Sequence, residues 1–298
     1  MSADIIIALV AGLGGMLGWG FSEFGAKKSV DYIGTVSSLV WAHVFGTGIL
    51  FALVFCEFLF YQTGLHVPSD PGEWLGLFFF GSLQAIVYYF AYKGFEKGEV
   101  SILSPIFASF AGLVALYSLV VFGEQLNGIF IVALSCVFAG VILMNIDIRK
   151  LSVFDLQIRT VPGLKEILIA TVLATIWTLG WDKFSSHKDW MMYTTFMFLS
   201  MTIAAFCIAR WAKVSLHNVK PAAWRYLWLI AIGEVVAYLA ITLGYSSTTH
   251  TSIVAILSGA SSLPTIILAR VFLREKMTPL QMVSSLIIIS GVVLLVLV

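Results

Sequence analysis

One carboxylate stands near the middle of a long apolar run. Glu234 lies at the centre of the run 223–246, whose other residues are mostly apolar. A charged side chain at the bilayer centre costs about 2.5–3.5 kcal/mol on insertion scales, so such a residue is a candidate for substrate binding or proton transfer. The structural alternative is a protonated glutamate that hydrogen-bonds a neighbouring helix.

Polar residues about 150 positions earlier match this carboxylate and its neighbour. At an offset of 150, Gln84 and Tyr88 fall on Glu234 and Tyr238. A tyrosine four residues on lies one turn along the same face of a helix. Each tyrosine would then present a hydroxyl and a ring to the same cavity. We therefore predict that these four side chains belong to one substrate site.

Two tryptophans occupy corresponding positions in the two halves. Trp19 falls on Trp177 at an offset of 158. Their rings could hold a substrate between them and would attract a cationic one, or they could be anchors at the membrane interface. For Trp181, one turn further, we favour the anchor. For Glu23 we favour an ion pair with Lys27 at i+4.

Other polar residues inside the apolar runs are candidates for proton coupling or for a pathway. His43 could carry protons together with Glu234, although a buried, hydrogen-bonded imidazole is the simpler interpretation. Prolines free backbone carbonyl groups, and nearby hydroxyls can line a polar path or form hinges. Plain helix packing through small residues is an equal alternative. The hinge or pathway candidates are Pro105, Ser109, Ser258, Ser262 and Pro264.

The elements that must position these residues are membrane helices. Of the 298 residues, 60% are hydrophobic and only 11% are charged, whereas a soluble domain is about 25% charged. The apolar residues come in runs long enough to cross about 30 Å of hydrocarbon. We predict an all-α membrane protein with ten transmembrane helices, at about 4–26, 34–61, 73–95, 99–122, 126–146, 164–183, 189–211, 223–246, 250–273 and 278–298.

The chain also has the signs of an internal repeat. Glu124 aligns with Glu275 at an offset of 151, in a short turn between two apolar runs. We interpret each glutamate as a cap of the following helix, since carboxylates are favourable at helix N-termini. We expect a first five-helix repeat at 1–147, a linker at 148–163 and a second repeat at 164–298. Five is odd, so the second copy must enter the membrane inverted.

The basic residues give the orientation. Of the 17 Lys and Arg residues, all but Lys183 and Lys188 fall at the ends of the first, third, fifth, seventh and ninth runs, or in the loops that follow them. By the positive-inside rule these loops are cytoplasmic. We therefore expect a multi-pass protein of the plasma (inner) membrane with both termini extracytoplasmic.

Several stretches resemble a known family. "GWGFSEFGAKKSVDYIG" (18–34), "FGEQLNGIFIVALSCVFAGVILM" (122–144) and the segment 244–295 are similar to the drug/metabolite transporter superfamily, of the EamA-like kind. The resemblance implies ten helices in two inverted repeats and a central pathway for small organic molecules such as amino acids, sugars, quaternary amines or drugs. Many members have cytoplasmic termini, so the predicted orientation of this chain departs from the family.

Enzyme and cofactor signatures are missing from the sequence. "GLGGML" (12–17) falls short of a dinucleotide motif, and no zinc, nucleophile-elbow or phosphate-loop motif occurs. We expect no catalytic residues, no cofactor, no metal and no nucleotide. The formal net charge of +1 argues against nucleic acid as a partner. The partners we expect are a small-molecule substrate and the lipid bilayer, and we expect the protein to act as a monomer.

We predict a secondary transporter of a small amphipathic or cationic metabolite, such as an amino acid or a quaternary amine. In inverted-repeat transporters the substrate binds near the midplane between the repeats, and one repeat rocks against the other. Coupling to protons through Glu234 would be one way to drive it. An intramembrane enzyme, or a receptor or assembly factor without flux, remains the alternative.

Overall fold

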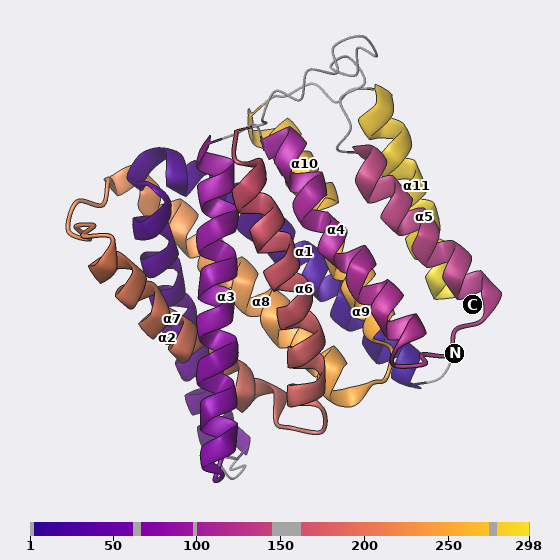
Figure 1. The fold of residues 1–298 in the computed structure, drawn as a ribbon, viewed down its shortest axis with the longest axis horizontal. Coiled ribbons are helices and arrows are strands. Elements are labelled where there is room, and N and C mark those ends of the chain that lie inside the picture. Colours follow the sequence, from indigo (N-terminus) through magenta and orange to yellow (C-terminus); the bar gives the residue numbers. More distant parts are fainter. Residues whose placement is uncertain (1–2, 62–66, 98–99, 145–161, 274–278, 298) are drawn as a thin grey trace.

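Every regular element in the part of the chain that the structure describes is a helix (Figure 1). The structure is a computed structural model, and it describes residues 3–61, 67–97, 100–144, 162–273 and 279–297. The helices are α1 (Ala3–Ile33), α2 (Thr35–Tyr61), α3 (Pro71–Lys97), α4 (Val100–Val120), α5 (Gly128–Met144), α6 (Leu164–Ser185), α7 (Trp190–Trp211), the 3₁₀ turn η2 (Pro221–Ala223), α8 (Trp224–Ser247), α9 (Thr251–Gly259), α10 (Ser262–Leu273) and α11 (Pro279–Leu297).

The all-α prediction is confirmed for these residues. Six helices are long and apolar enough to cross a membrane: α1, α2, α3, α6, α7 and α8. Shorter apolar segments lie in α4, α5 and α11. The ninth predicted run is divided into α9 and α10, and the break falls at Ala260–Ser261. The total of ten spans stays a prediction. The predicted linker lies almost wholly outside the described residues.

Side chains next to the turns define several helix ends. Asp70 accepts a hydrogen bond from Gly72 N at 2.9 Å, with Pro71 in the first position of α3, where its missing N–H costs nothing. Asp189 accepts from the backbone N–H groups of the first turn of α7. Gly34, with φ +77°, separates α1 from α2, and this left-handed conformation favours glycine.

The helices of the two halves pack in matching pairs, where α1 to α5 correspond to α6, α7, α8, α9–α10 and α11. Helix α1 packs on α8, and the counterpart pair is α6 on α3. Likewise α3 packs on α7, and the counterpart pair is α8 on α2. Helix α4 packs on α6, and its counterparts α9 and α10 pack on α1. When each helix is exchanged for its counterpart in the other half, the pattern of contacts between the halves stays approximately the same.

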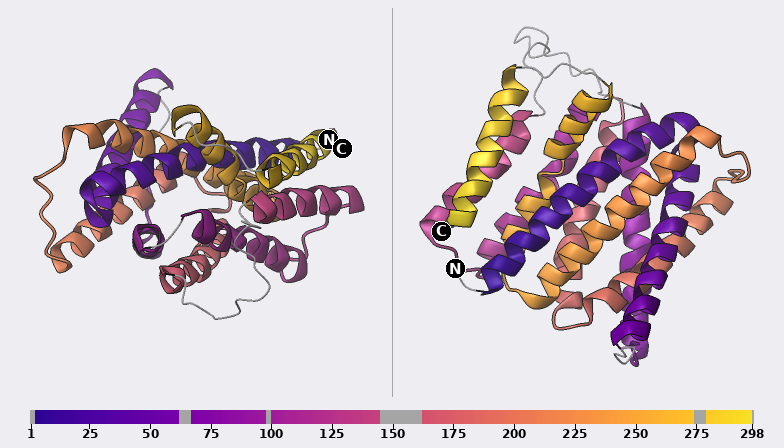
Figure 2. Two further views of the ribbon diagram at one scale, coloured as in Figure 1. Left: turned by 90° about the horizontal axis from the view of Figure 1, so that it is seen from above. Right: turned by 180° about the vertical axis from the view of Figure 1, so that it is seen from behind.

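Corresponding helices run in opposite directions. Phe51, late in α2, contacts Phe196 near the start of α7, whereas Trp41 donates to Leu216 O beyond the end of α7. In the α5–α11 pair, which forms one edge of the molecule (Figures 1 and 2), Gly140 faces Ile288 and Gly291 faces Ala133 and Val137. Antiparallel counterparts are the arrangement that an inverted repeat requires.

The two halves approach each other closely where α1 crosses α8. A Cβ on Gly18 would collide with the carbonyl oxygen of Gly233 and lie 2.6 Å from Ala237 N. Small residues allow membrane helices to approach this closely. This crossing positions Trp19 and Ser22 of α1 beside the middle of α8, where Glu234 lies.

We expect Gly18→Ala to destabilise the fold by about 1–3 kcal/mol, because the added methyl group has to displace the backbone of α8. The matched control is Gly48→Ala, since Gly48 lies exposed in α2 and an added Cβ would meet nothing within 4 Å. Thermal unfolding of both variants in detergent measures the difference. Equal stability of the two variants would contradict the close crossing.

Candidate functional site

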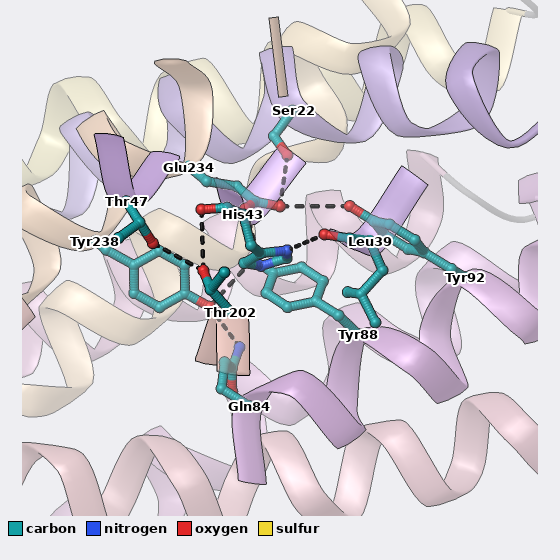
Figure 3. A network of polar contacts seen from close by, with 10 residues as sticks. All are labelled: Ser22, Leu39, His43, Thr47, Gln84, Tyr88, Tyr92, Thr202, Glu234 and Tyr238. Carbon is teal, nitrogen blue, oxygen red and sulfur yellow. Dashed lines mark hydrogen bonds and ion pairs between the residues drawn. The ribbon is translucent and has the colours of Figure 1, made fainter. Parts of the chain in front are cut away.

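The side chain of Glu234 is fully buried and is surrounded by groups from three other helices (Figure 3). Its Oε1 accepts hydrogen bonds from Ser22 Oγ of α1 and from Tyr92 OH of α3, both at 3.3 Å. Its Oε2 lies 3.3 Å from His43 Nε2 of α2. A buried carboxylate requires such partners, because an uncompensated charge away from water is costly.

The contacts of His43 direct its second ring nitrogen toward the carboxyl group of Glu234. His43 Nδ1 lies 2.6 Å from Leu39 O, and since a carbonyl only accepts, Nδ1 must carry a hydrogen. A neutral imidazole would then direct the lone pair of Nε2 at Glu234 Oε2. That pair of atoms is within ion-pair distance but lacks the alignment of a hydrogen bond. A proton on either His43 Nε2 or Glu234 would remove the conflict of two facing acceptors.

The matched residues of α3 and α8 meet across the two halves. Gln84 Nε2 donates to Tyr238 OH at 2.5 Å, and Tyr238 OH donates to Tyr88 OH at 3.1 Å. The structure thus brings Gln84, Tyr88 and Tyr238 together as the offset predicts, and the His43 ring lies 5.5 Å from that of Tyr88. That these residues bind a substrate stays a prediction.

Trp19 and Trp177 both pack edge-on against Tyr238, with ring centroids at 5.8 and 5.6 Å. Trp177 is buried and donates from Nε1 to Phe80 O at 3.0 Å. The interior position of Trp177 argues against the interfacial-anchor interpretation. For Trp181 that interpretation is wrong, because its side chain is fully buried, stacks on Trp177 and donates to Thr242 Oγ1 at 3.0 Å.

A cavity of about 60 Å³ lies beside this network. This is more than the roughly 10–15 Å³ that one water molecule needs. Of the predicted binding residues, Trp19, Gln84, Tyr88 and Trp177 line it, whereas Glu234 and Tyr238 do not. Three buried polar atoms of lining residues have no hydrogen-bond partner in the part of the chain that the structure describes: Trp19 Nε1, Gln84 Oε1 and Ser262 Oγ.

The cavity lies toward one side of the molecule. Its lining residues in α1 and α3 run from the middle of those helices toward their C-terminal ends, and those in α4 run from its middle toward its N-terminal end, whereas those in α6 lie near the middle of that helix. These ends carry the loops that the positive-inside rule predicts to be cytoplasmic. The cavity therefore extends from the middle of the bundle toward that predicted side.

The predicted hinge residues have different environments. Ser109 and Ser258 donate to carbonyl groups of their own helices, Ile106 O at 2.6 Å and Ala255 O at 3.1 Å, which fits plain packing. Ser262 lines the cavity just after the break between α9 and α10. Pro264 is buried in the first turn of α10, against Gly20 of α1. Pro105 lies in α4, but its side chain is outside the described part.

Three residues of the site were not predicted from the sequence. Tyr92 lies four residues after Tyr88, so the helical spacing that singled out Tyr88 also reaches it. Ser22 carries no comparable signal. Glu23 was expected to pair with Lys27, and this is wrong, because Lys27 Nζ binds Asp31 Oδ1 at 3.1 Å. The Glu23 carboxylate instead accepts from Ser261 Oγ at 2.7 Å and from Thr265 Oγ1 at 3.2 Å.

On the side of the bundle opposite the cavity, Glu124 joins the first half of the chain to the second. Its carboxylate accepts from Ser252 Oγ at 2.6 Å and from Ser252 N at 3.0 Å, at the first turn of α9. The prediction that Glu124 caps the helix that follows it, α5, is therefore wrong. Helix α5 is capped by Asn127, whose Oδ1 accepts from Phe130 N at 2.9 Å. Glu124 caps a helix of the other half. Its counterpart, Glu275, lies outside the described residues.

Comparison with known proteins agrees with this architecture. The sequence model of the EamA-like transporter family matches residues 6–146 and 162–297, nearly the whole chain in two parts. One solved crystal structure, described only as that of a protein, superimposes with a TM-score of 0.76 over 99% of each chain at 15% identity. At that identity the likeness concerns the fold alone. No curated protein matches the sequence significantly.

We expect the Glu124–Ser252 contact to couple energetically across the two halves. In a double-mutant cycle, Glu124→Ala and Ser252→Ala should each lower the unfolding free energy, with a coupling of about 0.5–3 kcal/mol. Denaturant titration in mixed micelles measures it. In the control cycle, Asn127→Ala with Ser252→Ala should be additive, since Asn127 caps only α5. Additivity in the first cycle would exclude the contact.

Proposed function

Because the chain belongs to the EamA-like transporter family, we propose that it is a proton-coupled secondary transporter of a small organic metabolite. The substrate is amphipathic or cationic, such as an amino acid or a quaternary amine. Ten spans form two inverted repeats, at 1–147 and 164–298, joined by a cytoplasmic linker, with both termini outside the plasma membrane. The substrate binds at the cavity between the repeats.

The observation that carries this proposal is the Glu234–His43 pair. The two groups lie 3.3 Å apart at the meeting point of helices from both halves, fully buried and next to the cavity. They need one proton between them, and the pair connects through Tyr92 and Ser22 to the cavity wall. A group that can gain or lose a proton beside a substrate cavity is what coupling requires.

The position of the cavity supports alternating access with an inward-facing conformation. The cavity extends toward the ends of α1 and α3, which the basic residues predict to be cytoplasmic. On the other side, Glu124 ties the α4–α5 turn to α9. Transport to that side would need this contact to open while the cytoplasmic ends close around the cavity, as one repeat rocks against the other.

The position of the same pair argues against an intramembrane enzyme. Two convergent groups at depth are the minimum that such an enzyme needs, and Glu234 and His43 do converge. Neither of them lines the cavity, however, because Ser22 and Tyr92 lie in front of Glu234. They are placed to exchange protons and not to contact a reacting bond.

Glu234→Gln should abolish accumulation driven by a pH gradient while substrate exchange persists, because the amide cannot carry the proton. His43→Asn should act in the same direction. The transport probe is chosen by thermal shift of purified protein against amino acids, quaternary amines and sugars, since a ligand of the folded state raises apparent stability. Uptake is then measured in proteoliposomes.

The control for this prediction is Thr195→Val, which removes a buried hydroxyl that donates to Met191 O of its own helix at 2.8 Å. It should transport like the wild type. Undiminished gradient-driven uptake by Glu234→Gln would remove the pair from the mechanism. Wild-type transport that ignores an imposed pH gradient would make the protein a uniporter.

Trp19→Phe should weaken the apparent affinity for the transported compound by about three- to tenfold, the loss expected for one neutral hydrogen bond. The substitution keeps a ring and removes the Nε1–H that is unpaired at the cavity. The same substitution at the highly exposed Trp211 should leave KM unchanged. If the two variants behave alike, Trp19 makes no polar contact with the substrate.

A further inference from the structure

Glu23 is a carboxylate at the cavity for which the structure shows no cationic partner. It lies one turn beyond Trp19 in α1 and lines the cavity. Among the described residues its bonds come only from the neutral hydroxyls of Ser261 and Thr265. Lys27, the nearest cation along the helix, is bound to Asp31. A ligand that enters the cavity therefore meets a carboxylate that no cation of the described chain neutralises.

Several aromatic side chains line the cavity together with Glu23. Tyr92, Phe95, Phe107 and Phe110 line it together with Trp19. Aromatic faces attract organic cations, and the attraction grows when the cation is desolvated. A metal ion would need more charged ligands, and the described residues hold no group of three His, Cys, Asp or Glu side chains that could bind one. A carboxylate among aromatic rings fits an alkylammonium group.

Glu234 is placed differently. Its Oε1 is occupied by Ser22 Oγ and Tyr92 OH, and its Oε2 faces His43. It does not line the cavity, whereas Ser22 and Tyr92 do. A substrate in the cavity as it stands would have to displace one of these side chains to reach Glu234, but it would meet Glu23 directly.

We infer that the two carboxylates divide the work: Glu23 binds the positive charge of the substrate, and the Glu234–His43 pair carries the proton. The inference rests on the proposed function and deepens it, since it specifies an organic cation as the substrate and names its charge partner. Ser261 and Thr265, which hold Glu23, come from the broken span of the other half. Binding of a cation at Glu23 therefore affects a contact between the two halves.

The test is binding to purified protein in detergent, without membrane or gradient. The probes are tetramethylammonium, tetraethylammonium and benzyltrimethylammonium chloride, with sodium chloride and sodium benzenesulfonate at equal ionic strength as controls. Isothermal titration calorimetry should show binding of at least one ammonium probe to the wild type. Glu23→Gln should weaken it by at least about tenfold, and by more than Glu234→Gln does. Asp182→Asn, at a buried carboxylate of α6 that does not line the cavity, should bind like the wild type.

Glu23→Asp, which keeps the charge, should retain more of the binding than Glu23→Gln, so that a loss in Glu23→Gln cannot be attributed to misfolding. Two results with the variants would overturn the inference: unchanged binding by Glu23→Gln, or an equal loss of binding in Glu234→Gln. Two results with the wild type would also overturn it: no binding of any ammonium probe, or binding of benzenesulfonate as tight as that of the ammonium probes. Binding is measured without a gradient, so a wild type that binds an ammonium probe but shows no gradient-driven uptake contradicts the proposed function and leaves this inference standing.

Discussion

The cost of a carboxylate inside an apolar bundle organises the centre of this protein. Glu234 is fully buried, and an ionisable group at that depth is stable only when other groups converge on it. Its partners come from α1, α2 and α3, that is, from the first half of the chain, while Glu234 belongs to the second. The polar centre therefore joins the halves, and the glycine crossing of α1 and α8 provides the short distance that the Ser22 contact needs.

The approximate twofold exchange of helices produces an asymmetric site. The same position of the repeat is occupied by Gln84 in α3 and Glu234 in α8, yet Gln84 lines the cavity and donates to Tyr238, while Glu234 lies behind the cavity wall. Likewise Trp19 lines the cavity with an Nε1–H that has no partner among the described residues, whereas the Nε1–H of Trp177 is bound to Phe80 O. A repeat duplicates the scaffold, but the role of each side chain depends on what it meets across the interface.

The sequence predicted the helical architecture and much of the centre, and its errors share one cause. Offsets between the halves brought Gln84, Tyr88, Glu234 and Tyr238 to attention, and the structure places these side chains within one network. The errors concern long-range partners: Glu23 was assigned to Lys27, and Glu124 to the helix that follows it. Helical spacing and capping rules describe neighbours in the chain. In a bundle whose halves are antiparallel, polar side chains also find partners more than 100 residues away, which no local pattern contains.

Both of those misassigned carboxylates act on the same broken span. Glu124 binds Ser252 at the start of α9, and Glu23 binds Ser261 and Thr265 at the start of α10. Residues 251–260 are all buried, so α9 cannot move without disturbing its neighbours. Each half of the span thus begins at a carboxylate from the first repeat, one on the side away from the cavity and one at the cavity. In a transporter that alternates, releasing one contact while keeping the other would let α9 and α10 move separately. The break at Ala260–Ser261 is the point in the described chain at which such a difference can be absorbed without breaking a continuous helix.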